Sequence, residues 1–244
     1  MKKIKIFCTL GPSTLNKKFL RFAQRNRIDL VRLNMSHLSA KNLERNIKFI
    51  KANSNLNICI DTEGAQIRTK TEKKILLQKN QKLTIFRHKK IHFYPEEVFH
   101  KLKKNDILEI GFDGLIIKVT KKLKDRIQAN CIRGGTLEKN KGVHLSNRNI
   151  NLSFLTSKDF AAIKLGKKYK IKNYALSFTN TCNDILKFSK LLPFENKIYK
   201  IETNKAVKNF NSLNKVANDF LIDRGDLSKE ISIEKIPKTQ RLIF

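Results

Sequence analysis

The chain has 244 residues, 40% of them hydrophobic, which is enough to bury a substantial core and argues against wholesale disorder. Its 52 Lys and Arg against 21 Asp and Glu give a formal net charge of +31, which would suit a polyanionic partner. The Lys-Lys pairs are, however, spread along the whole chain, whereas a nucleic-acid groove gathers basic and aromatic residues on one element. We attribute most of the charge to a bias toward the residues of A/T-rich codons, and we do not expect nucleic acid to be the partner.

The sequence carries no sign of membrane insertion, secretion or zinc binding. No apolar run approaches the roughly 18 residues of a membrane span, and the apolar run near the basic N-terminus is too short for a signal peptide. The cysteines are far apart and form no CxxC or Cys/His cluster, which fits a reducing compartment: Cys8, Cys59, Cys131 and Cys182. We therefore predict a cytoplasmic protein with no membrane partner.

Strands and helices alternate in the first part of the chain. We expect strands over residues 4–10, 29–34 and 57–62, the first of them buried, with a helix over 16–26 and another that Ser39 caps. This βαβαβ order is typical of a parallel sheet with crossover helices.

Residues 68–146 show a different pattern, with brief alternating runs and no long helical period, which predicts a small antiparallel β module. The βα alternation then resumes. We expect helices over 157–168, capped by Thr156 and Asp159, and over 182–192 and 204–216, and strands over 174–178, 197–201 and 219–223. The domain prediction is therefore a first barrel part over 1–67, an inserted β domain over 68–146, and a second barrel part over 147–244.

Polar side chains follow the ends of the expected strands. They are Arg32, Asn34 and Ser36, then Asp61, Thr62 and Arg68, then Lys200 and Glu202, and finally Arg224 and Asp226. In a parallel βα barrel the chemistry gathers at the carboxyl ends of the strands, where the loops converge. Carboxylate, amide and hydroxyl oxygens suit Mg²⁺ or K⁺, and Arg and Lys suit a phosphoryl group. Each residue alone is more often a surface charge or a turn residue; the repetition across strands indicates a site.

The same stretches resemble pyruvate kinase. In the family's order they are KIFCTLGPST, VRLNMSH, DTEGAQIRT, KNKGVHLSN, LTSKDF, ALSF, KIETNKAVKNFNSL and DRGDLSKEISIEKIPKTQ, and they cover essentially the full chain. The resemblance implies a (β/α)8-type TIM barrel, here truncated to about six βα units, with an inserted β-barrel lid domain. It also implies phosphoryl transfer between phosphoenolpyruvate and ADP, yielding pyruvate and ATP in glycolysis, with Mg²⁺ (or Mn²⁺) and K⁺.

The resemblance also assigns roles to matched positions. Glu202 and Asp226 match the divalent-metal ligands, and Asn34, Ser36, Asp61 and Thr62 match the monovalent-cation site. Arg32 matches a contact to phosphoenolpyruvate, Gly225 lines the substrate pocket, Arg68 and Lys141 match contacts to nucleotide phosphates, and Lys200 matches the lysine that stabilises the phosphoryl group in flight.

Four departures from the family pattern bear on activity. Glu63 stands where the family has a lysine near the phosphate site, the segment SFTN at 177–180 lacks a basic residue, and Ser228 replaces a glycine. The chain stops at Phe244, so the resemblance implies that the last two barrel strands, a proton-transfer threonine and a C-terminal domain are missing.

These observations leave three hypotheses. The first is a pyruvate-kinase-like phosphotransferase, completed by copies of itself as a homo-oligomer or by a second chain that supplies the remaining strands of a split enzyme. The second is a catalytically impaired binding or regulatory protein on the same scaffold. The third and weakest is a basic nucleic-acid binder.

Overall fold

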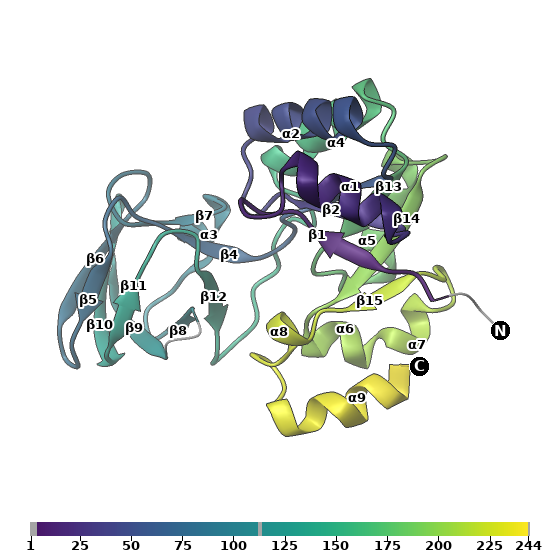
Figure 1. Cartoon of the computed structure of the whole chain (residues 1–244). Coiled ribbons are helices and arrows are strands. Elements are labelled where there is room, and N and C mark those ends of the chain that lie inside the picture. The colour runs from purple at the N-terminus through teal and green to yellow at the C-terminus, as the bar shows by residue number, and fades with distance from the viewer. Residues whose placement is uncertain (1–3, 112–113, 244) are drawn as a thin grey trace. The chain divides into compact units, whose positions relative to one another are not determined.

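The computed structural model of the chain describes residues 4–111 and 114–243 (Figure 1). The chain divides into two compact units, with borders at Ala65–Gln66 and Ser153–Phe154. The first unit is formed by the two outer parts of the sequence and the second by the segment between them. The borders predicted from the sequence follow residues 67 and 146.

A parallel sheet forms the framework of the first unit. Its described strands lie in the order β1-β2-β3-β13-β14-β15, each parallel to its neighbours. They are β1 (Phe7–Thr9), β2 (Leu30–Asn34), β3 (Ile58–Asp61), β13 (Asn173–Leu176), β14 (Asn196–Ile201) and β15 (Phe220–Ile222). The predicted α/β class and parallel sheet are therefore confirmed.

The helices of the first unit up to residue 213 follow the predicted order, and the three helical segments after the last strand were not predicted. They are α1 (Lys17–Arg25), α2 (Ala40–Asn53), α4 (Ser157–Lys168), α5 (Cys182–Leu191), α6 (Asn204–Lys208), α7 (Phe210–Leu213), α8 (Arg224–Leu227), the 3₁₀ turn η1 (Ile233–Lys235) and α9 (Ile236–Ile243). Ser39 caps α2 as predicted, because its side chain accepts a hydrogen bond from the N–H of Asn42. None of the described helices has the length and apolar character needed to cross a membrane.

Two details of the secondary-structure prediction were wrong. The helix expected over 204–216 is interrupted at Asn209, whose side-chain amide donates to the carbonyl of Asn180. The strand expected to be buried over 4–10 pairs only from Phe7 and leaves Ile4, Ile6 and Phe7 85%, 47% and 40% exposed. This strand is at an edge of the described sheet, and an apolar run does not distinguish an edge strand from a central one.

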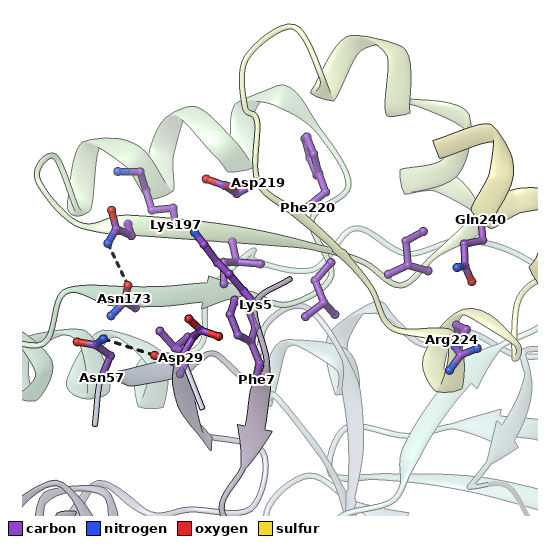
Figure 2. Close-up of a pocket in the computed structure, with 15 residues that line it drawn as sticks. Lys5, Phe7, Asp29, Asn57, Asn173, Lys197, Asp219, Phe220, Arg224 and Gln240 are labelled. Carbon is purple, nitrogen blue, oxygen red and sulfur yellow. Dashed lines mark hydrogen bonds between the residues drawn. The ribbon is translucent and has the colours of Figure 1, made fainter. Parts of the chain in front are cut away.

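The two faces of the sheet are covered differently. The main core lies on one face, where residues such as Leu20, Leu43 and Phe188 from the helices pack against the strands. The other face holds a small cluster of strand residues only, Leu30, Cys59 and Ala175 with Ile198 beside them. This second face lines a pocket of about 740 Å³ (Figure 2).

The second unit is the predicted β module. Its main sheet has the order β6-β10-β9-β8-β12-β4-β7, with β11 and β5 paired separately. The strands are β4 (Ile67–Lys70), β5 (Ile75–Leu77), β6 (Lys82–Phe86), β7 (His92–Tyr94), β8 (Ile107–Ile110), β9 (Leu115–Lys122), β10 (Arg126–Arg133), β11 (Gly135–Leu137) and β12 (Gly142–Leu145). The neighbouring strands are antiparallel and enclose a hydrophobic core of their own. A short helix, α3 (Glu97–Lys101), was not predicted.

Asp159 fastens the loop after β3 to the start of α4. It forms the predicted capping box with Thr156, and its fully buried carboxylate also accepts the backbone N–H groups of Glu63 at 2.7 Å and Gly64 at 3.1 Å. Gly64 has φ +67°, and a Cβ there would lie 2.6 Å from the carbonyl oxygen of Ser177, so only glycine fits. The loop that follows Asp61 is thus hydrogen-bonded to Asp159 and packed closely against Ser177.

We predict that Asp159→Ala lowers the free energy of unfolding by about 3 kcal/mol or more, because two loop N–H groups lose their buried acceptor together with the helix cap. Urea unfolding followed by circular dichroism measures this. The matched control is Asp184→Ala in the capping box of α5, which should cost about 1 kcal/mol. Equal losses in the two variants would contradict the role given to Asp159.

Candidate active site

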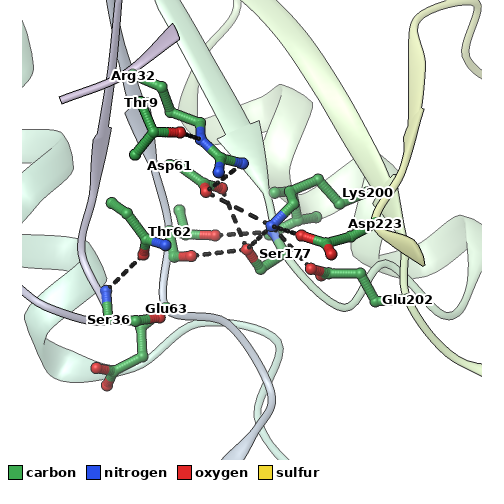
Figure 3. A network of polar contacts seen from close by, with 12 residues as sticks. Thr9, Arg32, Ser36, Asp61, Thr62, Glu63, Ser177, Lys200, Glu202 and Asp223 are labelled. Carbon is green, nitrogen blue, oxygen red and sulfur yellow. Dashed lines mark hydrogen bonds and ion pairs between the residues drawn. The ribbon is translucent and has the colours of Figure 1, made fainter. Parts of the chain in front are cut away.

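A buried lysine lies at the centre of the candidate site. Lys200 is on β14 with its side chain 5% exposed, and its ammonium is 2.7 Å from Glu202 Oε1 and 3.3 Å from Asp223 Oδ2. The same ammonium lies 3.5 Å from Asp61 Oδ2 and 3.3 Å from Ser177 Oγ (Figure 3). One ammonium therefore meets three carboxylates.

Strand geometry explains this convergence. Asp61 ends β3, Ser177 follows β13, Glu202 follows β14 and Asp223 follows β15, and these strands are parallel neighbours. The carboxyl ends of parallel strands meet at one edge of the sheet. Lys200 and Glu202 are two residues apart, a spacing that turns strand residues to the same side.

Arg32 joins the same network through Asp61. Its guanidinium is 3.2 Å from Asp61 Oδ2, and its Nε donates to Thr9 Oγ1 at 2.8 Å. Asp61 is fully buried, whereas the Arg32 side chain is 23% exposed. The buried carboxylate thus links Lys200 to a cation that a ligand can still reach.

The four residues matched to a monovalent-cation site lie around the ends of β2 and β3. Asn34 Oδ1 accepts the N–H of Ser36 at 2.9 Å, and Thr62 Oγ1 accepts the N–H of Ser177 at 3.0 Å. Ser177 Oγ contacts Asp61 Oδ1 at 3.2 Å and the carbonyl of Thr62 at 2.8 Å. Ser177 was not proposed as a site residue; it lay inside the strand expected over 174–178, whereas β13 ends at Leu176.

A carboxylate cluster lies beside Lys200. Among the described residues, Glu202, Asp223 and Asp226 each place one carboxylate oxygen within 4.8 Å of the others. Glu202 is buried and also accepts the N–H of Phe178 at 2.6 Å. The sequence predicted Glu202 and Asp226 as a pair but missed Asp223, which it treated only as the end of a strand.

The charges shift one another's proton affinities. Burial raises the pKa of Glu202 to about 7 and also raises the pKa of Asp61. Burial opposes the charge of Lys200, but the carboxylates of Glu202, Asp61 and Asp223 outweigh it and raise the pKa of Lys200. Burial likewise opposes ionisation of Asp223, but Lys200 outweighs it and lowers the pKa of Asp223. Lys200 and Asp223 therefore stay charged at neutral pH.

Glu63 is buried and forms an ion pair with Lys158 of α4. Its carboxylate points away from the cluster around Lys200 (Figure 3). Its second oxygen, Oε1, is buried without a hydrogen-bond partner. Lys158 thus offsets the negative charge of Glu63, and the ammonium of Lys158 is then not available to a ligand.

The remaining matched residues are divided between the units. Gly225 lies in α8, where a Cβ would meet only Asp223 Oδ1, at 3.5 Å. Arg68 and Lys141 belong to the second unit, where β4 and β12 pair Arg68 with Gly142 and so bring Arg68 close to Lys141. Lys141 also forms an ion pair with Glu138 at 3.1 Å.

Comparison with known proteins gives the family. A family model described as pyruvate kinase, barrel domain, matches residues 1–244. The chain belongs to the pyruvate kinase family. It is 28% identical to pyruvate kinase of Staphylococcus epidermidis over 99% of this chain and 44% of that protein. Pyruvate kinase of Bacillus licheniformis is 29% identical over 99% of this chain and 45% of that protein. Pyruvate kinase of Chlamydia trachomatis is 28% identical over 99% of this chain and 53% of that protein. The chain thus spans about half the length of these relatives.

We predict that Lys200→Met lowers the free energy of unfolding by about 3–5 kcal/mol, because Asp61 and Glu202 lose the ammonium that compensates their buried charge. The matched control is Lys197→Met on the same strand. Among the described residues its ammonium bonds the carbonyls of Leu192 and Glu195, so the cost should be about 1–2 kcal/mol. Urea unfolding measures both. A loss for Lys200→Met no larger than for the control would contradict the central place given to this ion cluster.

Proposed function

We propose that the chain carries a pyruvate-kinase-like phosphotransferase site, which transfers a phosphoryl group between phosphoenolpyruvate and ADP with Mg²⁺ (or Mn²⁺) and K⁺. The observation that supports this most is the convergence of Lys200, Arg32 and a cluster of carboxylates at one edge of the parallel sheet. Family membership makes this reaction class the first to consider.

The carboxylate cluster fits a divalent cation. Three carboxylates with oxygens within 4.8 Å of one another are the hard donors that Mg²⁺ prefers, and Glu202 would be the buried anchor of the set. We assign Glu202, Asp223 and Asp226 as the residues that would hold it. A bound Mg²⁺ supplies positive charge that polarises phosphoryl and carboxylate oxygens.

Lys200 and Arg32 supply the fixed positive charge for the phosphoryl group. The carboxylates around Lys200 keep its ammonium protonated and hold it in one position, so that no reorganisation is needed when charge develops on the phosphoryl oxygens. Arg32 is oriented by Thr9 and Asp61 and is accessible enough to bind a substrate oxygen. Arg68 and Lys141 would bind the nucleotide phosphates.

The oxygens of Asn34, Ser36, Asp61 and Thr62 would hold K⁺. Three of the four residues are buried, so their oxygens could replace the water shell of a bound monovalent cation. Asp61 provides the negative charge that such a site needs, and it also contacts Arg32 and Lys200. The monovalent site and the phosphoryl site would then share one carboxylate.

We further propose that the parallel sheet represents about six βα units of the family's TIM barrel and that the second unit is its lid domain. β1 and β15 each have one neighbour among the described strands, and one face of the sheet carries no helix residue in its core cluster. Parallel sheets normally have both faces covered. Further βα units, from a second chain or another copy of this one, would cover that face.

The ion pair between the buried Glu63 and the partly exposed Lys158 favours a second candidate, a binding or regulatory protein with impaired catalysis. Lys158 is engaged by Glu63 and does not restore a free positive charge in place of the lysine expected at position 63. Such a protein would bind phosphoenolpyruvate and Mn²⁺ without turnover, and the ligands would raise its melting temperature.

The enzyme proposal predicts pyruvate formation from phosphoenolpyruvate and ADP that requires both Mg²⁺ and K⁺. Lys200→Ala should lower kcat by about 10²-fold or more, because it removes a fixed charge from the phosphoryl group, whereas Lys197→Ala should have little effect. A coupled lactate dehydrogenase assay measures the rates. Pyruvate no higher than in the Lys200→Ala variant would contradict the enzyme proposal, and melting-temperature shifts without turnover would support the binding protein.

A further inference from the structure

The second unit contains a cationic pocket that the proposed function does not use. It measures about 410 Å³ and is lined by Lys79, Lys104 and Lys118 together with three asparagines and Thr120. Among the described residues, none that lines it is acidic or aromatic. The pocket belongs to β9, β10 and the turns beside them, whereas Arg68 and Lys141 lie on or beside β4 and β12; in the sheet order β8 separates β9 from β12.

The strand register fixes the position of one of the pocket lysines, Lys118. Asn130 on β10 is the cross-strand partner of Lys118 on β9 and of Lys82 on β6. All three residues are exposed, and in an antiparallel sheet directly paired residues share one face. An asparagine thus stands between two lysines in one row, and Lys118 of this row lines the pocket.

The two turns that complete the pocket are fixed to the same sheet. Asn80 and Asn105 have left-handed backbones, with φ of 67° and 72°, a conformation that asparagine tolerates well. The N–H of Asn80 donates to the carbonyl of Cys131 at 2.8 Å, and the N–H of Asn105 donates to the carbonyl of Val119 at 2.9 Å. The neighbouring Lys79 and Lys104 are therefore carried on anchored turns.

Two carboxylates of the second unit are engaged by cations outside the pocket. Glu138 pairs with Lys74 and Lys141, and Asp106, next to Asn105, is buried and bound by Arg148 through two contacts of 2.7 Å. As far as the described residues show, Lys79, Lys104 and Lys118 have no ion pair. The chain's general excess of lysine would place ammonium groups on convex surface, where water solvates each one. Three of them around one concavity repel one another, and a bound anion would relieve that repulsion.

We propose that this pocket is a binding site for a compact anion that bears phosphate oxygens, such as a polyphosphate or a small phosphorylated metabolite. The volume falls in the range of small-ligand sites, and ammonium and amide groups are donors that match phosphate oxygens. A nucleic-acid strand is disfavoured, because the described residues that line the pocket include no aromatic side chain to stack on bases.

The test is titration of the full chain with inorganic tripolyphosphate by isothermal calorimetry, in EDTA so that metal-linked binding elsewhere is suppressed. The triple variant Lys79→Gln/Lys104→Gln/Lys118→Gln should weaken binding about tenfold or more, and the single variant Lys118→Gln about threefold. The matched control is Lys89→Gln/Lys121→Gln/Lys124→Gln, which removes the same charge from exposed positions of the same unit and should change affinity less than about twofold.

Equal weakening in the two triple variants would overturn the proposal, since general charge would then explain the binding, and so would no binding by the unaltered chain. Pocket-dependent binding of a 20-nucleotide single-stranded RNA without pocket-dependent binding of tripolyphosphate would overturn it in favour of a nucleic-acid site. Pyruvate formation by the pocket triple variant at the unaltered rate is expected in every case, so this test stands apart from that of the proposed enzyme activity.

Discussion

The candidate site depends on one constraint, the burial of the Lys200 ammonium among carboxylates. An isolated ammonium at this depth would lose its proton, but the carboxylates of Glu202, Asp61 and Asp223 outweigh the effect of burial. The ends of three strands must therefore stay in register so that Lys200 keeps its ion pairs with the three carboxylates. The same contacts that hold the edge of the sheet together also fix the ammonium that we propose acts in phosphoryl transfer.

Much of this arrangement could be predicted from local sequence. The caps at Ser39 and Thr156 follow from short-range hydrogen-bonding patterns, and the pairing of Lys200 with Glu202 follows from strand periodicity. The features that could not be predicted depend on contacts between residues far apart in the sequence. Asp223 and Ser177 enter the site because β15 and β13 are neighbours of β14, and the exposure of β1 depends on its place at the sheet edge. No spacing along the chain encodes these facts.

The departure at position 63 shows how structure changes the meaning of a substitution. From sequence, Glu63 shifts the charge near the phosphate site by two units. In the structure Lys158 neutralises the carboxylate, and Asp159, next in the chain, fixes the backbone of the same loop through two hydrogen bonds. The pair as a whole is neutral, so the local charge remains two units below that of a lysine at position 63 beside an unpaired Lys158.

The most direct test of this account is Mn²⁺ binding by the full chain, measured by electron paramagnetic resonance titration. The account predicts one tight site, weakened about tenfold or more in each of Glu202→Gln, Asp223→Asn and Asp226→Asn, as expected when a ligand of a shared ion is lost. Asp219→Asn, a carboxylate at the opposite end of β15, serves as the control and should bind like the unaltered chain. Unchanged affinity in the three cluster variants would contradict the assignment of the site.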